Sequence, residues 1–105
     1  MASDRGFVNY VAEQLQGAGI IRTKPMFGEY GLYCNGIFFA VICDDQLFIK
    51  ITPEVDAAFP DLPKAPPYDG ARDYFCIENI DNREVMTELV SLTCQSLKKS
   101  KKVKS

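Results

Sequence analysis

The chain has 105 residues and a mass of 11.8 kDa, the size of one small domain. Its 47% hydrophobic and 25% charged residues are typical of a folded soluble protein and exclude a wholly disordered chain. No apolar run approaches the ~20 residues of a membrane span, and Asp4 and Arg5 interrupt the start of the chain before the apolar core of a signal peptide. We therefore expect a cytoplasmic protein.

The formal net charge of −2 conceals an uneven distribution of charge. Five lysines lie near the C-terminal end of the chain: Lys98, Lys99, Lys101, Lys102 and Lys104. They leave seven of the 12 basic residues against 14 acidic ones, so the rest of the chain has a net charge of −7. Such an acidic body differs from the basic domain expected of a DNA-binding protein.

The chain contains no histidine, which excludes the usual catalytic triads and the His-containing zinc sites. It contains four cysteines without a C-x-x-C pair: Cys34, Cys43, Cys76 and Cys94. In a cytosolic protein this spacing predicts reduced, mostly buried thiols. We expect no catalytic residue, no metal and no cofactor, and hence a protein that is not an enzyme.

The first predicted helix covers about residues 4–17. Its apolar residues recur at helical spacing: Phe7, Val8, Val11 and Leu15. Ser3 is suited to cap the N-terminus of this helix, and Gly17 and Gly19 stop the pattern. The helix is amphipathic, so we expect it to pack on another element.

Residues 30–51 are predicted to form a three-stranded antiparallel meander. Asn35-Gly36 is a strong hairpin signal, because a type I′ turn needs positive φ at both central residues, and Asp44-Asp45 marks a weaker second turn. Strict alternation then gives two apolar faces, one with Phe38, Ala40, Ile42, Leu47, Ile49 and Ile51, and the other with Leu32, Cys34, Ile37, Phe39, Val41, Cys43 and Phe48. An antiparallel sheet often turns one face to water. We therefore expect a helix of this chain, or another molecule, to cover the second face.

A short helix and one or two short strands are predicted next. Thr52-Pro53 is suited to begin the helix, which Pro60 ends. A stiff, proline-rich crossing follows over residues 60–71. Residues 68–73 are a candidate hairpin, and residues 74–77 are predicted to form a strand.

The last predicted helix begins after Asp81, which has capping-box spacing with Glu84, and its apolar face extends to Leu97. Residues 98–105 form a basic tail that cannot bury anything and is predicted to be disordered. The domain is therefore expected to cover residues 1–97. The order α-βββ-α-β(β)-α predicts an α+β fold, a two-layer sandwich in which helices pack on an antiparallel meander sheet.

The segment from Pro25 to Tyr33 is rich in glycine and aromatic residues, which indicates a bent or bulged strand start. One interpretation is packing, with the aromatic side chains in the core. The other is a recognition edge for a protein partner. The candidate residues for that edge are Met26, Phe27, Gly28, Glu29, Tyr30, Gly31 and Tyr33, with Phe39 and Phe48 from the same sheet.

These residues also carry a resemblance to a known family. The run from Met26 to Tyr33, followed by Asn35-Gly36 and by Leu47 to Lys50, resembles the N-terminal domain of the TfoX/Sxy competence-regulator family. Further fitting segments are Pro66-Pro67-Tyr68, Gly70-Ala71, Tyr74-Phe75 and the last helix with Leu89, Leu92 and Thr93. The resemblance spans roughly residues 7–97. Many members carry a glycine where this chain has Glu29.

The resemblance implies an α+β fold grouped with secretion-chaperone-like domains, without known catalytic residues. Full-length relatives resemble coactivators that help the cyclic-AMP receptor protein act at competence promoters, and they carry a second, C-terminal domain. We therefore expect a short stand-alone member. It would be a non-enzymatic protein-interaction module that acts as a transcriptional (competence-type) coactivator or regulator. Its expected partner is the transcription machinery, and we also expect that it can form a homodimer.

Two alternatives stay open. The five terminal lysines are suited to weak, sequence-independent nucleic-acid binding, which the acidic body opposes. An enzyme-like small-ligand domain would draw on Glu29, Tyr30, Tyr33, Asp44, Asp45 and Lys50. Two adjacent carboxylates supply too few ligands for a metal site, and Lys50 would need a pKa that burial has lowered.

Overall fold

A computed structural model describes residues 4–26 and 29–104, with residues 100–104 described by their backbone alone. The elements in chain order are α1 (Arg5–Gln14), the 3₁₀ helix η1 (Gln16–Ala18), β1 (Ile21–Met26), β2 (Glu29–Cys34), β3 (Ile37–Cys43), β4 (Gln46–Ile49), α2 (Pro53–Ala58), β5 (Lys64–Ala65), β6 (Tyr74–Ile77) and α3 (Arg83–Lys104). Among the helices so described, none has the length and apolar character that a membrane crossing requires.

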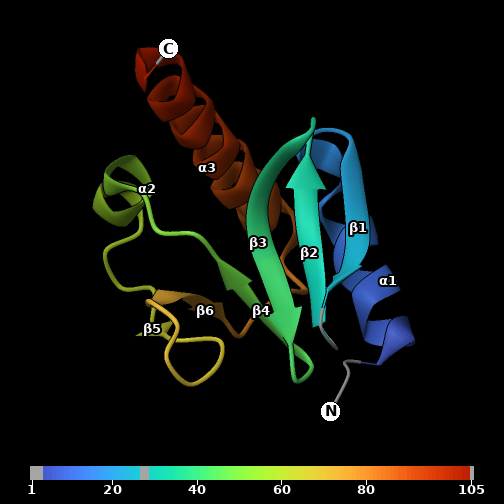
Figure 1. Cartoon of the computed structure of the whole chain (residues 1–105). Coiled ribbons are helices and arrows are strands. Elements are labelled where there is room, and N and C mark those ends of the chain that lie inside the picture. Colours follow the sequence, from blue (N-terminus) through green and yellow to red (C-terminus); the bar gives the residue numbers. More distant parts are fainter. Residues whose placement is uncertain (1–3, 27–28, 105) are drawn as a thin grey trace.

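The predicted α+β fold is confirmed. The strands form one six-stranded antiparallel sheet with the order β1-β2-β3-β4-β6-β5. Helices α1 and α3 lie behind the sheet in Figure 1, and α2 sits beside α3. We call the sheet face turned away from α1 and α3 the outer face.

Both predicted hairpin turns are confirmed. Asn35 and Gly36 have φ of 52° and 84°, and Asp44 and Asp45 have φ of 54° and 58°. Positive φ at both central residues is the requirement of a type I′ turn. The Asn35 side chain adds a tertiary contact, because its Oδ1 accepts a hydrogen bond from the Ile20 backbone N–H at 2.9 Å.

The predicted division of the meander into two strictly alternating faces is wrong. Leu32 pairs with Ala40 but Tyr33 pairs with Phe38, so Phe39 has no partner on β2 and forms a bulge. The bulge lets both Phe39 and Ala40 join the core, where each is fully buried. Phe39 and Ala40, which strict alternation had placed on opposite faces, therefore share the face that the helices cover.

Strand β1 was not predicted. Arg22, Thr23, Lys24 and Pro25 are all exposed on this edge strand, so the segment shows no apolar alternation. Lysine and proline on an edge strand discourage pairing with other chains. The strand is defined by its pairing with β2, in which Arg22 lies opposite Tyr33.

Two predicted helix caps are corrected. The cap of α1 is Asp4, whose carboxylate accepts from the Phe7 N–H, whereas Ser3 lies outside the described residues. The cap of α3 is Asn82, whose Oδ1 accepts from the Val85 N–H at 3.2 Å. Asp81 instead accepts a hydrogen bond from the Tyr10 hydroxyl and joins α1 to the start of α3. The predicted cap of α2 by Thr52 is confirmed.

The last helix does not end at Leu97, as the apolar pattern predicted, but continues through the predicted disordered segment to Lys104. Lysine has a high helix propensity, and basic residues are favourable near a helix C-terminus because of the helix dipole. In Figure 1 this end of α3 projects beyond the sheet.

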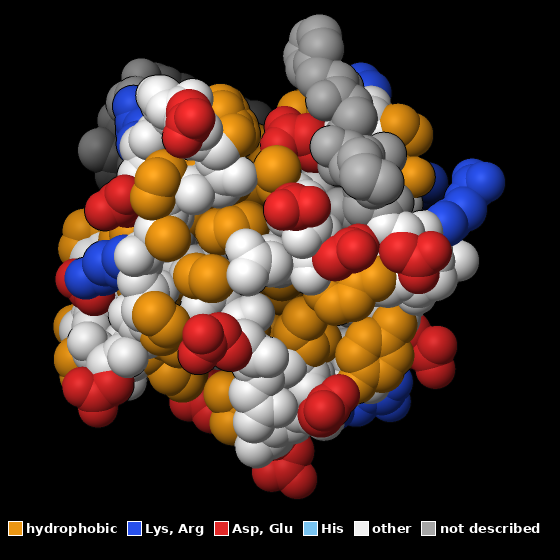
Figure 2. All heavy atoms as spheres, turned by 90° about the horizontal axis from the view of Figure 1, so that it is seen from below, with side chains coloured by type: hydrophobic (Ala, Val, Ile, Leu, Met, Phe, Trp, Pro, Cys, Tyr) orange, Lys and Arg blue, Asp and Glu red, His pale blue; other side chains and the backbone are white. Residues whose placement is uncertain are grey.

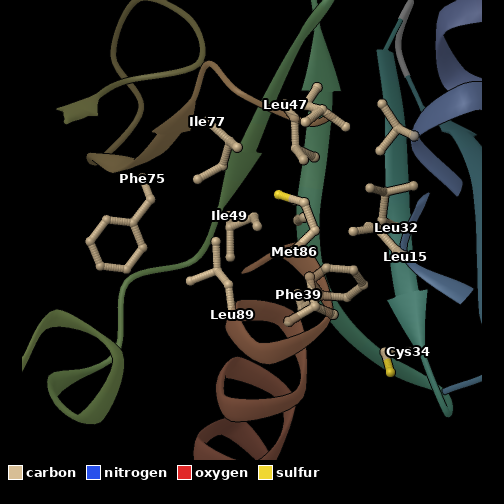
Figure 3. Packing of buried hydrophobic residues seen from close by; sticks show 14 of the residues in the cluster. Leu15, Leu32, Cys34, Phe39, Leu47, Ile49, Phe75, Ile77, Met86 and Leu89 are labelled. Atoms are coloured by element: carbon tan, nitrogen blue, oxygen red, sulfur yellow. The ribbon is translucent and has the colours of Figure 1, made fainter. Parts of the chain in front are cut away.

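The hydrophobic core lies between the sheet and the helices α1 and α3 (Figure 3). Its large, fully buried side chains include Leu15 from α1, Leu32, Phe39 and Ile49 from the sheet, and Met86 and Leu89 from α3. Val55 of α2 is buried in the same cluster. The sheet face opposite the outer face therefore forms one side of this core.

Candidate functional site

The outer face carries a group of aromatic side chains at one end. The Tyr33 and Phe38 rings lie 5.4 Å apart between their centroids, with an angle of 51° between their planes. A Cβ atom on Gly31 would lie 2.6 Å from the Met26 Sδ and 3.0 Å from the Phe38 Cε1, so these three residues are packed together. Glycine allows this close approach because it has no side chain.

The centre of the outer face is already covered. Val41 and Phe48 are only 5% and 3% exposed. They lie in one row across the sheet, because Val41 pairs with Gly31 and with Phe48, which in turn pairs with Cys76. The chain itself therefore buries these two side chains, and no second molecule is needed to do so.

The predicted recognition edge divides between the two faces of the sheet. Met26, Glu29 and Tyr33 are half-buried residues of the outer face, whereas Tyr30 packs against the core. Phe27 and Gly28 lie outside the described residues. The edge therefore does not act as one continuous surface.

Two residues assigned to that edge are unsuited to contact a partner. Phe39 is fully buried in the core, and Phe48 is buried at the centre of the outer face. The bulge is the physical reason for the position of Phe39, since it turns this side chain toward the helices. Only the exposed rim of the face is left for binding.

A basic hollow adjoins the aromatic group, and we call it the Lys50 hollow. Its lining includes Phe38, Lys50, Arg72, Asp73 and Tyr74, and its volume is about 410 Å³. The Lys50 Nζ lies 4.6 Å from the centroid of the Phe38 ring. Burial, and secondarily the Arg72 guanidinium, lower the pKa of Lys50, while burial raises the pKa of Tyr74.

Arg72 and Tyr74, which line the hollow with Lys50, were not predicted from the sequence. They come to Lys50 because β6 pairs with β4, with Ile49 opposite Phe75. The only local signal was a lysine directly after a buried strand. The neighbours of Lys50 depend on the pairing of β4 with β6, two segments that lie more than twenty residues apart along the chain.

The four cysteines are free, and two of them, Cys34 and Cys94, are buried as predicted, while Cys43 and Cys76 are half-buried. Cys34 lies in the core and Cys43 on the outer face, so the prediction that they share a face is wrong. Burial, together with the carboxylate of Glu29, raises the pKa of Cys43 to about 11. Burial also raises the pKa values of Cys76 and Cys94. The thiols of Cys43, Cys76 and Cys94 are therefore protonated at neutral pH and are poor nucleophiles.

The paired carboxylates Asp44 and Asp45 form the tight turn between β3 and β4, and Asp45 accepts a hydrogen bond from the Asp4 backbone N–H at 2.6 Å. Within residues 4–26 and 29–104, no three His, Cys, Asp or Glu side chains are grouped as metal ligands would be. Seen from below, carboxylates outnumber basic side chains on the surface (Figure 2). The Lys50 hollow, with two basic residues and one acid in its lining, differs from that surface.

The fold and these surfaces define a small α+β domain built on a single antiparallel sheet. The chain matches the TfoX N-terminal domain over residues 13–97 and belongs to this family, as the resemblance predicted. It is also 30% identical over 80 residues to an uncharacterized 12.7 kDa protein in the trpE 5' region of Spirochaeta aurantia. That alignment covers 76% of this chain and 70% of the relative.

Proposed function

We propose that this chain is a non-enzymatic protein-interaction module of transcriptional regulation. It binds a partner protein through the aromatic end of the outer face, formed by Tyr33 and Phe38 with the basic residues Arg22 and Lys24 of β1. The observation that carries the proposal is the packed pair of half-buried rings at 5.4 Å on a sheet face over which no helix of residues 4–26 and 29–104 lies (Figure 1). Membership of the TfoX N-terminal family supports the regulatory context.

The aromatic pair is suited to bind a protein because it is held in place before binding. Tyr33 and Phe38 are neighbours across β2 and β3, and each ring restricts the other. Aromatic residues dominate the energetics of many interfaces, and little side-chain entropy is lost when they are already ordered. A partner protein therefore gains contact area here with little loss of side-chain entropy.

The charges around the pair indicate the chemistry of the partner. Arg22 lies opposite Tyr33 and Lys24 opposite Gly31, so both basic side chains share the outer face. Both are exposed, and neither forms an ion pair with a carboxylate of the described chain. We therefore expect a partner surface with apolar side chains at its centre and carboxylates at its rim, because complementary charge favours association.

Site-directed photocrosslinking tests the proposal. A benzoylphenylalanine at position 38 is expected to crosslink to one protein in the producing cell, whereas the same group at exposed Tyr10 on α1 is not. With that protein purified, Arg22→Glu should weaken binding at least about tenfold, as expected when a favourable charge contact becomes a repulsive one. Arg5→Glu on α1 is the matched control.

Three outcomes overturn the proposal. The first is equal crosslinking from positions 38 and 10. The second is a crosslink from position 38 to a second copy of this chain alone, which identifies a homodimer interface instead. The third is a purified partner whose affinity does not change with Arg22→Glu. Each measurement uses protein whose folding has been checked by circular dichroism.

Weak nucleic-acid binding is a second candidate function, favoured by the length of α3. Because the helix continues to Lys104, the five terminal lysines lie on one continuous helix. Closely spaced cations neutralise phosphates and give salt-dependent binding without sequence preference. Binding to duplex DNA that is lost when residues 98–105 are deleted supports this candidate, and binding that survives the deletion excludes it.

A further inference from the structure

Two basic side chains, one next to β4 and one next to β6, line the same hollow. Lys50 directly follows β4, and Arg72 lies two residues before β6, the antiparallel neighbour of β4. Both line the Lys50 hollow of about 410 Å³, together with Tyr74 and Phe38. The pairing of β4 with β6 therefore brings two positive charges to the same hollow.

No ion pair compensates these charges within the described residues. Neither Lys50 nor Arg72 forms an ion pair there, although the hollow also includes Asp73. The same chain does form an ion pair elsewhere, between the Lys64 Nζ and the Asp56 carboxylate at 2.9 Å. The Phe38 ring attracts the Lys50 ammonium through a cation–π contact. Such a contact does not replace an oxygen atom as a hydrogen-bond acceptor for the ammonium.

Three of the polar side chains that line the hollow can donate hydrogen bonds, whereas the Asp73 carboxylate only accepts them. The Lys50 ammonium and the Arg72 guanidinium carry donors alone, and the Tyr74 hydroxyl adds another. Charged donors of this kind bind phosphate and carboxylate oxygens strongly. The partial burial that lowers the pKa of Lys50 also reduces competition from water.

We infer that the Lys50 hollow binds the oxyanionic group of a small molecule, a phosphate ester or a carboxylate, between Lys50 and Arg72. The volume exceeds the need of a single anionic group, so there is room for the rest of a small ligand against Phe38. The site goes beyond the proposed protein interface. Of the residues assigned to that interface it shares only Phe38, so its ligand can be tested with no partner protein present.

Titrations followed by amide NMR test this inference on the full chain. The probes are inorganic phosphate, adenosine monophosphate as a phosphate ester, and citrate as a carboxylate, each at a constant ionic strength set with sodium chloride. We expect saturable shifts at residues 50 and 72–74 with at least one probe. The probe that saturates at the lowest concentration identifies the oxyanion chemistry.

Charge-removing variants provide the decisive comparison. Lys50→Gln and Arg72→Gln should each lower the affinity for the binding probe at least about tenfold, the effect of one lost charge-assisted hydrogen bond. Arg5→Gln, on α1 and outside the lining of the hollow, removes the same charge and should change the affinity by less than about twofold. Unchanged amide spectra away from the hollow show that each variant is folded.

The pKa of Lys50 gives a second measurement. A bound anion favours the charged ammonium, so the saturating probe should raise the pKa of Lys50. The inference is overturned if no probe gives saturable shifts. It is also overturned if binding persists in both Lys50→Gln and Arg72→Gln.

Discussion

The Lys50 ammonium nitrogen lies 4.6 Å from the centroid of the Phe38 ring. The contact joins the end of β4 to β3, and the Lys50 backbone N–H reinforces it by donating to the Phe39 carbonyl at 2.9 Å. A half-buried cation over an aromatic face is attracted by the electrostatic field of the ring. This pair therefore links the aromatic group to the basic hollow.

A double-mutant cycle measures that link. Phe38→Leu and Lys50→Met should be coupled by about 0.5–1 kcal/mol in the free energy of unfolding, the usual value for such a pair near the surface. Urea unfolding of the parent chain, both single variants and the double variant gives the coupling. Phe38→Leu with Lys99→Met on α3 is the control and should be additive. Equal coupling in both cycles would contradict the assignment.

Replacement of Gly31 by alanine is expected to destabilise the domain. Gly31→Ala places a methyl group 2.6 Å from the Met26 Sδ and 3.0 Å from the Phe38 Cε1, and such overpacking should lower the free energy of unfolding by about 1–2 kcal/mol. In a Met26→Ala background the cost should fall by half or more, because the nearest contact is gone. A cost that is the same in both backgrounds, measured by thermal unfolding, would assign the effect to the backbone instead.

The reactivity of Cys43 is expected to depend on Glu29. Burial and the Glu29 carboxylate raise the pKa of Cys43 to about 11, so little thiolate is present at pH 8. Glu29→Gln removes the carboxylate, the pKa falls, and alkylation by iodoacetamide at pH 8 should become faster, by up to about tenfold for each unit of pKa. Cys76 serves as the internal control, since its pKa is raised by burial and by Glu78. Unchanged alkylation of Cys43 would remove Glu29 as a cause.

The turn at Asn35 should be sensitive to the loss of its side-chain oxygen. Asn35→Ala removes the acceptor for the Ile20 N–H and places alanine at a φ of 52°, so we expect a loss of about 1–2 kcal/mol in the free energy of unfolding. Asn35→Asp keeps an acceptor at the same position and tolerates this backbone conformation, so it should cost less than half as much. Chemical denaturation of the two variants measures both losses in the free energy of unfolding. Equal losses in Asn35→Ala and Asn35→Asp would exclude the hydrogen bond as the cause.

Removal of the last residues of α3 should affect stability little. Leu97 packs against the core, whereas Lys98 and Lys99 are exposed. A chain ending at Leu97 should retain its free energy of unfolding to within about 1 kcal/mol, whereas a chain ending at Gln95 should lose about 2 kcal/mol more through the absent leucine. Calorimetric unfolding of both chains provides the measurement. A large loss in the longer chain would show that the lysine-rich end of α3 stabilises the domain.

Much of the fold follows from local chemistry in the sequence. Asn35-Gly36 and Asp44-Asp45 predicted their turns correctly because positive φ is a property of the residues themselves. Thr52 before Pro53 predicted the start of α2 for the same reason. The apolar spacing of α1 and α3 predicted which faces they bury. These features need no knowledge of distant parts of the chain.

The remaining features depend on contacts between distant segments. The bulge at Phe39 shifts the pairing of β2 with β3, so strict alternation placed Phe39 and Cys43 on one face although they lie on opposite faces. β1 shows no apolar pattern, and only its pairing with β2 defines it. Lys50 was a candidate from sequence, but Arg72 and Tyr74 reach it through the pairing of β4 with β6. The sequence thus determined one small acidic α+β domain and its turns, whereas the tertiary structure alone decided which charges and rings meet, because strand pairing and packing bring together residues that are far apart along the chain.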